Sequence, residues 1–301
     1  MKIVVTGSLG NISKPLTQEL VEKGHTVTVV SRKAERIAAI EAIGATAAIG
    51  TMQDVTFLAN TFKGADIVYV MEAFGAAGEF FNKELDFMES INIIARSYKQ
   101  AIEESGVKKV IHLSSIGAHS NKGNGILAFH FNVENILKEL PGDISIKFMR
   151  PVGFYNNLFG FIPVIKSEGV IISNYGGTFK KPWVSPFDIA TVIAEEMEKP
   201  FDGRTFRYIA SEEIASDDIA KILGEAIGKP DLKWLVVSNE QILENLLTIG
   251  MNPDVAKGFV EMQASQQSGI LYEDYFRNKP TLGKVKVADF AKDFATKFKE
   301  Q

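Results

Sequence analysis

The first half of this chain alternates short apolar runs with segments whose apolar residues recur at helical spacing. Runs such as Ile-Val-Val, Val-Thr-Val-Val and Ile-Val-Tyr-Val are rich in β-branched residues, which is typical of strands buried on both faces. The pattern predicts strands at Lys2–Thr6, Thr26–Ser31, Thr46–Ile49, Ile67–Met71, Lys109–Ser114 and Ser145–Arg150. It predicts helices at Lys14–Lys23, Lys33–Ile43, Thr56–Phe62, Phe80–Ser105 and Phe129–Leu140.

Strands that alternate with helices need crossover connections, so the chain is predicted to fold as an α/β protein with a doubly wound parallel sheet. The pattern changes after Pro151, where aromatic, glycine and asparagine residues predict loops with short elements. Later segments predict helices at Pro186–Lys199 and Ser216–Ile227 and a strand at Thr205–Ala210, followed by a mostly helical C-terminal third.

These changes predict two domains. Residues 1–155, with 183–210 returning to them, are expected to form the sheet domain. Residues 156–182 and 211–301 are expected to form a smaller, mostly helical lobe that closes over one edge of the sheet and contacts the substrate.

Composition narrows the function classes. The net charge of −4 gives no basic field for nucleic acid, and no apolar run approaches the roughly 18 residues of a membrane span. The apolar run at the N-terminus is too short for a signal peptide, so a cytoplasmic protein is expected. The chain has no cysteine, which excludes disulfides, thiolate nucleophiles and cysteine-bound metals, and its four histidines show no metal-ligand spacing.

A glycine turn follows the first predicted strand. The sequence Lys-Ile-Val-Val-Thr-Gly-Ser-Leu-Gly-Asn-Ile-Ser places Gly7 and Gly10 between that strand and a helix. In such a turn, backbone N–H groups and the helix dipole face a pyrophosphate. Ser13 stands where a third glycine is expected. The pattern predicts a dinucleotide site on a Rossmann-type domain; the alternative is a glycine turn without a ligand.

The residues after the second strand indicate which dinucleotide is bound. Ser31, Arg32 and Lys33 stand where an acidic residue would accept from the ribose 2′-hydroxyl of NAD(H). An arginine pairs with a phosphate through two charge-assisted hydrogen bonds, and cations at a helix start are otherwise opposed by its dipole. NADP(H) is therefore predicted in preference to NAD(H); the alternative is a solvated basic helix start.

The order of several motifs resembles the NmrA-like group of atypical short-chain dehydrogenases, which includes quinone reductases and NADP-sensing regulators. The motifs are at Thr6–Ser13, Ser31–Lys33, Phe62–Met71, Gly106–Ala118, Arg150–Asn157 and Trp183–Ala190. The resemblance covers roughly the first 210 residues. It implies a Rossmann domain, a small C-terminal lobe and a substrate cleft between them.

The resemblance also implies a set of cofactor contacts. The pyrophosphate would lie against Gly7, Ser8, Leu9, Gly10, Asn11 and Ile12, and the 2′-phosphate against Ser31, Arg32 and Lys33. Adenine would meet backbone groups near Met52, because Thr51 and Met52 replace the acidic residue of relatives. The ribose side would be lined by Met71, Glu72 and Ala73, and the nicotinamide ring by Pro151, Val152, Gly153 and Phe154.

Short-chain dehydrogenases usually donate a proton from a tyrosine in a Tyr-x-x-x-Lys pair beside a serine. Ser114 and Ser115 match the serine region, but the register of the next helix places Ile126 and His130 at the tyrosine and lysine positions. His130 is therefore the candidate to donate a proton or hold a ribose hydroxyl, and the alternative is a packing histidine. The string Tyr275–Lys279 lies in the C-terminal lobe and is interpreted as coincidence.

Two functions remain open. The first is an NADPH-dependent reductase of a quinone-like or other small carbonyl acceptor, with Phe154–Ile165, Trp183, Phe187 and Tyr272 lining an aromatic cleft. The second is a non-catalytic NADP(H) sensor that acts through a regulatory protein partner, favoured by the missing Tyr-x-x-x-Lys pair. A sugar-nucleotide epimerase is a third option, disfavoured because its chemistry needs the same tyrosine.

Overall fold

The computed structural model describes residues 1–73 and 77–300. Its main feature is a parallel sheet of seven strands in the order β3-β2-β1-β4-β5-β6-β10. The strands are β1 (Lys2–Val5), β2 (Thr26–Ser31), β3 (Thr46–Ile49), β4 (Ile67–Val70), β5 (Lys109–Leu113), β6 (Ser145–Pro151) and β10 (Arg204–Ile209). The predicted α/β fold is confirmed, and each predicted strand of this sheet agrees with the structure to within one residue at either end.

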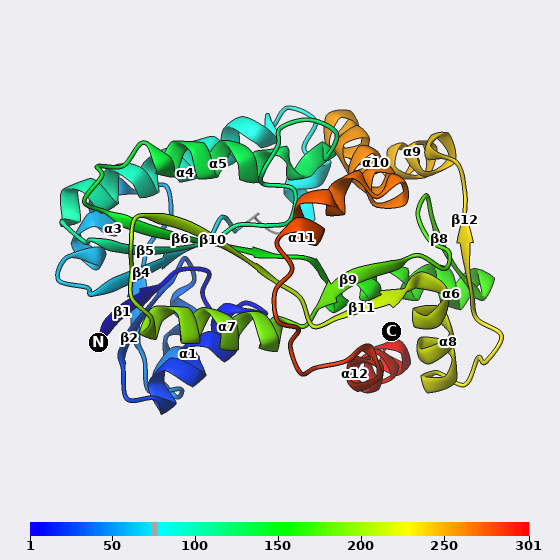
Figure 1. Ribbon diagram of the computed structural model, residues 1–301, viewed down its shortest axis with the longest axis horizontal. Helices are drawn as coiled ribbons and strands as arrows, with labels where there is room; N and C mark the ends of the chain where they lie inside the picture. Colours follow the sequence, from blue (N-terminus) through cyan, green and yellow to red (C-terminus); the bar gives the residue numbers. More distant parts are fainter. Residues whose placement is uncertain (74–76, 301) are drawn as a thin grey trace.

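Helices cover both faces of this sheet (Figure 1). One face packs against α1 (Ser13–Glu22), α2 (Ile37–Glu41) and α7 (Pro186–Glu198), and the other against α3 (Val55–Phe62), α4 (Phe87–Ser105) and α5 (Ala128–Lys138). Alternation along β1 sends Ile3 and Val5 to the first core and Val4 to the second. This explains why the central strands are apolar at successive positions.

Two predicted helices begin or end elsewhere than expected. The long helix expected from Phe80 begins only at Phe87, because the Asp86 carboxylate accepts a hydrogen bond from the Glu89 N–H at 2.9 Å and caps it. A separate 3₁₀ turn, η2 (Ala77–Phe81), precedes it. The segment expected to be helical from Lys33 is a 3₁₀ turn, η1 (Ala34–Arg36), followed by the short α2.

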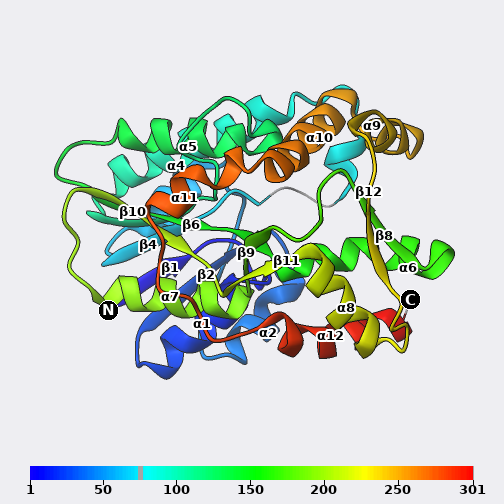
Figure 2. The same ribbon diagram turned by 45° about the vertical axis from the view of Figure 1, so that its right-hand side comes forward.

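The remaining elements lie beyond one edge of the sheet (Figures 1 and 2). The helices and turns of this part are η3 (Gly125–Leu127), η4 (Tyr155–Phe161), α6 (Ile162–Glu168), α8 (Ser216–Ala226), α9 (Asn239–Thr248), α10 (Pro253–Ser268), η5 (Ile270–Tyr272), α11 (Glu273–Arg277) and α12 (Val287–Glu300). Its strands are β7 (Gly153–Phe154), β8 (Val170–Ser173), β9 (Lys180–Val184), β11 (Glu212–Ala215) and β12 (Lys233–Val236). The sequence pattern predicted none of these strands, which form two small sheets, β11-β9-β7 and β12-β8.

The division into two domains remains our proposal. A third core, built around Tyr155, Trp183, Trp234 and Phe294, draws all its buried residues from 155–183 and 219–294, which supports a separate lobe. Strand β10 returns to the large sheet, but β9 pairs inside the lobe. Leu271, from η5, packs into the first core of the sheet domain and ties the two parts together. In the described chain, no helix is long and apolar enough to cross a membrane.

Candidate functional site

The carboxyl ends of the parallel strands meet along one edge of the sheet. In open α/β sheets, ligands bind at this edge, where the strand order reverses. Here the order reverses between β1 and β4. The chain leaves β1 through Gly7, β2 through Arg32, β3 through Met52 and β4 through Ala73. These residues are far apart in the sequence, but each follows a strand of the parallel sheet. They therefore lie along the same edge of the sheet.

The turn after β1 has a backbone that only glycine fits well. Gly7 has φ +89°, and a Cβ atom there would lie 2.7 Å from Ser13 Oγ. Ser8 follows with φ +54°, and among the described residues it is the one non-glycine with positive φ. Its N–H donates to Val30 O at 3.0 Å, which helps hold this conformation. Strained backbone of this kind concentrates at ligand clamps.

The turn ends at the start of α1, whose N-terminal side is open. Within the described chain, no side chain caps this end of α1, and its first turn holds no acidic residue. Asn11 and Gly10 are exposed, whereas the side chain of Ile12 is buried in the first core, so Ile12 offers only its backbone N–H. The arrangement leaves the positive end of the helix dipole facing solvent, as a phosphate site requires.

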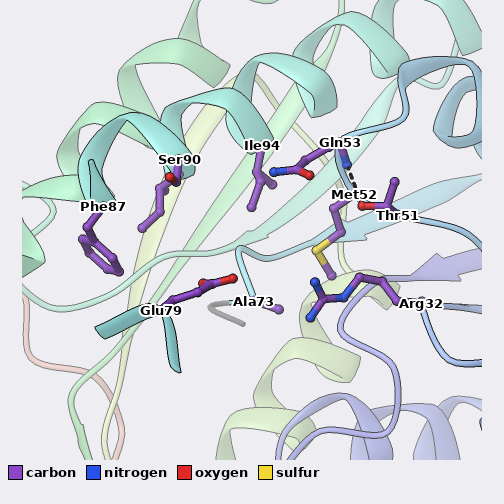
Figure 3. Close-up of a pocket in the computed structure, with 10 residues that line it drawn as sticks. Arg32, Thr51, Met52, Gln53, Ala73, Glu79, Phe87, Ser90 and Ile94 are labelled. Carbon is purple, nitrogen blue, oxygen red and sulfur yellow. Dashed lines mark hydrogen bonds between the residues drawn. The ribbon is translucent and has the colours of Figure 1, made fainter. Parts of the chain in front are cut away.

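A pocket beside β2 and β3 contains Arg32, the residue predicted to bind the 2′-phosphate. It is lined by Arg32, Thr51, Met52, Gln53, Ala73, Glu79, Phe87, Ser90, Ile91 and Ile94. Figure 3 shows the Arg32 guanidinium directed into the pocket beside the Met52 side chain. The sequence did not predict that α4 contributes Phe87, Ser90, Ile91 and Ile94 to this pocket. No sequence motif marks a helix that contacts adenosine. The pocket combines the Arg32 guanidinium with polar and apolar side chains, among them the Glu79 carboxylate.

Ser31 and Lys33 lie differently from Arg32. Ser31 is buried, and its hydroxyl accepts from Ser8 Oγ at 3.0 Å and from the Lys33 N–H at 3.2 Å. It therefore ties the glycine turn to the end of β2, and this geometry favours a positioning role. Lys33 is exposed, and its ammonium lies 3.7 Å from the Glu35 carboxylate.

The residues after β4 are held by their backbone. Met71 N–H donates to Thr6 Oγ1 at 3.1 Å, and Met71 O accepts from Tyr98 Oη at 2.8 Å. The side chain of Glu72 is buried, with its carboxylate 3.0 Å from His112 Nε2. Only the backbone of Glu72 is then available to a cofactor, and the buried His112 is its structural partner.

A larger cavity, about 610 Å³, lies between the sheet edge and the lobe. Residues between 80 and 154 contribute Phe80, Phe87, Ser115, Ile116, Ile126, Leu127, Phe129, His130, Val152, Gly153 and Phe154. Residues between 157 and 272 contribute Asn157, Gly160, Phe161, Tyr175, Trp183, Phe259, Met262, Gln263, Gln266, Leu271 and Tyr272. The lining includes Val152–Phe154, the segment expected to flank nicotinamide. Pro151, the last residue of β6, is buried, and its carbonyl accepts from the Ile116 N–H at 2.9 Å.

The wall of this cavity depends on a close approach between η3 and α10. Gly125 has φ +55°, and a Cβ atom there would lie 2.1 Å from Gly258 O. Because neither glycine carries a side chain, α10 can bring Met262 and Gln263 to the cavity. Helices whose backbones touch in this way need small residues at the crossing.

The candidate catalytic residues separate into two groups. Ser115 and His130 line the cavity. His130 Nδ1 is buried without a partner among the described residues. Burial first, and then the nearby His112 and Arg150 charges, hold the pKa of His130 well below its ordinary value. Ser114 is buried and is not among the residues that line the cavity, and its hydroxyl donates to Glu134 Oε1 at 2.7 Å.

Three other expectations can be placed. Ile126 lines the cavity at the position where a tyrosine was expected, so no hydroxyl is supplied there. The Tyr275 hydroxyl donates to Glu213 Oε1 at 3.0 Å, and Lys279 also pairs with Glu213, outside the cavity wall. The expectation for Phe187 was wrong: it is 59 % exposed on the first turn of α7, facing solvent.

Lys181 is a buried cation next to the cavity wall. It is 1 % exposed, and its ammonium lies 3.5 Å from Gly176 O and 4.8 Å from the ring centroid of the lining residue Tyr175. Burial lowers the pKa of Lys181 from 10.5 to about 8. Between these two values the unfolded chain binds more protons than the folded one, so this group makes stability rise with pH there.

Replacing this cation tests that linkage. Lys181→Met is expected to raise the free energy of unfolding at pH 7 by about 1–3 kcal/mol, because a buried charge is replaced by an apolar chain of similar length. The gain should shrink as the pH rises from about 8 toward 10.5. Above about pH 8, Lys181 of the folded protein is neutral, so the folded protein no longer holds a buried charge that the variant removes. Urea unfolding at several pH values measures it. The exposed neighbour supplies a control, Lys180→Met, which should change little. A loss of stability in Lys181→Met would contradict the account.

No group of three or more His, Cys, Asp or Glu residues that could hold a metal ion occurs in the described ranges 1–73 and 77–300. The sheet order, the strained glycine turn and the open helix start define a Rossmann protein with a dinucleotide site. A family model described as NAD(P)H-binding matches residues 7–200. The chain belongs to this NAD(P)H-binding family, which confirms the resemblance to atypical short-chain dehydrogenases.

Individual proteins show the same similarity at low identity. An NAD(P)H azoreductase of Xenophilus azovorans is 21 % identical over 263 residues, covering 87 % of this chain and 86 % of that protein. The structure of a triphenylmethane reductase of Citrobacter has a TM-score of 0.75 at 18 % identity, covering 98 % of this chain and 100 % of the other. An NADPH complex of a quinone oxidoreductase from Escherichia coli has a TM-score of 0.72 at 16 % identity, covering 97 % and 99 %. At these identities the two structures show a shared fold.

Proposed function

We propose that this protein is an NADP(H)-dependent reductase of a quinone-like or other small carbonyl acceptor. The observation that carries the proposal is the position of the cavity of about 610 Å³, whose lining includes Val152–Phe154, the segment expected to flank nicotinamide. The pocket that holds Arg32 lies at the ends of β2 and β3, at the adenosine side. Support also comes from the similar proteins described as an azoreductase and an NADPH-dependent quinone oxidoreductase.

Each group of residues has a proposed role toward the cofactor. The turn Gly7–Ile12 would hold the pyrophosphate through backbone N–H groups and the start of α1. Arg32 would hold the 2′-phosphate, with Ser31 fixing the glycine turn and Lys33 adding positive charge. Met52 and Ala73 would flank adenosine, and the backbone of Met71 and Glu72 the ribose side.

The bound dihydronicotinamide supplies a hydride, and reduction of a quinone or carbonyl also needs one proton. Pro151, Val152 and Phe154 would hold the ring beside the cavity, and Ser115 and His130 would hydrogen-bond the acceptor oxygen. Because the pKa of His130 is well below its ordinary value, this side chain is neutral at neutral pH. His130 is then a hydrogen-bond partner, and the reduced oxygen takes its proton from solvent. A quinone tolerates this, since its reduced oxygen is a weak base.

The alternative proposal is a non-catalytic NADP(H) sensor that acts on a protein partner. The specific observation in its favour is that Ile126 occupies the cavity wall where relatives that reduce carbonyls carry a tyrosine. The cavity favours the reductase, because a protein that senses only the cofactor needs no site for a second small molecule.

Steady-state turnover separates these two functions. NADPH consumption is measured with a panel of neutral quinones, with and without the protein. The reductase proposal expects saturable oxidation of NADPH well above the rate without protein, and slower oxidation of NADH at equal concentration. Oxidation that never exceeds the rate without protein, in a preparation that binds NADPH, would favour the sensor.

A further inference from the structure

The cavity wall carries no ionised side chain at neutral pH. Among the described residues, no Asp, Glu, Lys or Arg lines it. Its titratable groups are His130, Tyr175 and Tyr272. Burial holds the pKa of His130 well below its ordinary value and raises the pKa of both tyrosines. All three side chains are therefore neutral, although the chain as a whole is 23 % charged residues.

Three residues of the same wall carry buried polar atoms that have no partner within the described chain. They are the indole Nε1 of Trp183, the amide Oε1 of Gln263 on α10, and Nδ1 of His130. Trp183 is 3 % exposed. Buried polar groups in folded proteins are nearly always hydrogen-bonded, and the grouping of three such atoms on one wall favours a ligand site there.

We propose that the acceptor is an uncharged, flat aromatic molecule, and that Trp183 and Gln263 determine its specificity. The indole N–H of Trp183 donates to a carbonyl-type oxygen or an equivalent nitrogen of the ligand. The amide of Gln263 pairs with a polar substituent, and the surrounding phenylalanines contact the rings. This inference rests on the proposed reductase function for its statement that the ligand is the electron acceptor.

The electrostatics of the wall also rank charged ligands. An ion in this cavity loses its hydration and meets no counter-ion, which disfavours both signs of charge. The ammonium of Lys181, 4.8 Å from the Tyr175 ring centroid, adds a positive potential. This potential opposes a cation further and offsets part of the cost for an anion. The expected order of affinity is neutral, then anionic, then cationic.

Calorimetric titration of the protein saturated with the tetrahydro analogue of NADPH tests this order without turnover, because the ring of this analogue is uncharged and has no hydride to give. The probes are naphthoquinone, its sulfonate and a trimethylammonium derivative. Naphthoquinone should bind about tenfold or more tightly than the sulfonate, and the trimethylammonium compound most weakly, since each ion loses its hydration on entry. A charged probe that binds as tightly as naphthoquinone, or no binding of naphthoquinone, would overturn the inference.

Two variants test the named residues. Trp183→Phe and Gln263→Leu keep much of the side-chain shape, and each should weaken naphthoquinone binding by about five- to tenfold, as expected for one lost hydrogen bond. NADP⁺ binding reports that each variant is folded. Gln100→Leu is the matched control, since Gln100 is exposed on α4 and donates to Glu104 Oε1 on its own helix at 2.8 Å. Unchanged affinity for naphthoquinone in both cavity variants would refute their role.

Turnover of the same three probes with NADPH separates this inference from the proposed function. If naphthoquinone binds best but is not reduced, the reductase proposal fails and the preference for an uncharged ligand stands. If all three bind equally and are reduced, the reductase proposal stands and the inference fails.

Discussion

Replacing Glu134 by alanine is expected to lower the free energy of unfolding by about 3–5 kcal/mol, because it leaves a buried guanidinium without its main partner. Glu134 is 0 % exposed on α5, and Arg150 on β6 is 5 % exposed. Arg150 Nε donates to Glu134 Oε1 at 2.8 Å, and Nη2 donates to Oε2 at 2.7 Å. Asp274, whose carboxylate lies 3.5 Å from Arg150 Nη1 in this structure, would remain as a partner in the variant.

The pH dependence of this pair has a defined sign. Burial by itself raises the pKa of Glu134, but the hydrogen bonds and charge of Arg150 outweigh it and hold the pKa below 4.5. The contribution of Glu134 to stability is therefore complete above about pH 4.5 and is lost as the pH falls through the lowered value.

Chemical denaturation at pH 7 and at pH 3 measures both effects. The matched control is Lys138→Ala, which removes the exposed partner of Glu134 at 3.1 Å and should cost about 1 kcal/mol or less, as exposed ion pairs do. A loss below 1 kcal/mol in Glu134→Ala would mean that Arg150 finds water or another anion, and the account of this ion pair would be wrong.

Replacing Arg32 by alanine is expected to weaken NADPH binding by about 100-fold and NADH binding less than threefold, because only NADPH carries the 2′-phosphate. Figure 3 shows the guanidinium directed into the pocket that follows β2 and β3. A charge-assisted pair of hydrogen bonds accounts for the size of the effect. Calorimetric titration of both nucleotides measures it.

Arg36 provides the control for Arg32. It is an exposed arginine on η1, one turn along the chain, and Arg36→Ala should leave the affinities for both nucleotides unchanged. Equal losses for NADPH and NADH in Arg32→Ala would show that Arg32 does not read the 2′-phosphate, and the preference for NADP(H) would have no structural basis.

The sequence was enough to predict the large sheet because local pattern and global burial agree there. Thr26–Ser31 has the predicted bounds because its valines are buried in the cores on both sides of the sheet. Thr46–Ile49 also has the predicted bounds, although this edge strand has no fully buried residue. The short strands of the lobe escaped prediction. Strand β12 has a single buried residue, Trp234, and it pairs with β8, more than 60 residues earlier in the chain. Such pairing is decided by tertiary packing, which no local pattern records.

The candidate site divides in the same way. Residues that follow strands, such as Gly7 and Arg32, could be placed because the ends of parallel strands converge. The contribution of Gln263 could not be predicted, since a glutamine in a polar helical segment is typical of a solvated surface. It reaches the cavity because Gly125 and Gly258 let α10 approach η3. The pairing of Glu72 with His112 could not be predicted either, because it joins the end of β4 to a residue of β5 that lies 40 positions later in the chain.

The most direct test of the reductase proposal is a single-turnover reaction with NADPH deuterated on one face of the nicotinamide ring. The NADPH-loaded protein is mixed with naphthoquinone, and the NADP⁺ formed is analysed for deuterium. The account predicts rapid oxidation with loss of deuterium from one face only, because a ring held beside Val152 and Phe154 exposes one face to the cavity. Oxidation no faster than without the protein, or equal loss from both faces, would contradict it.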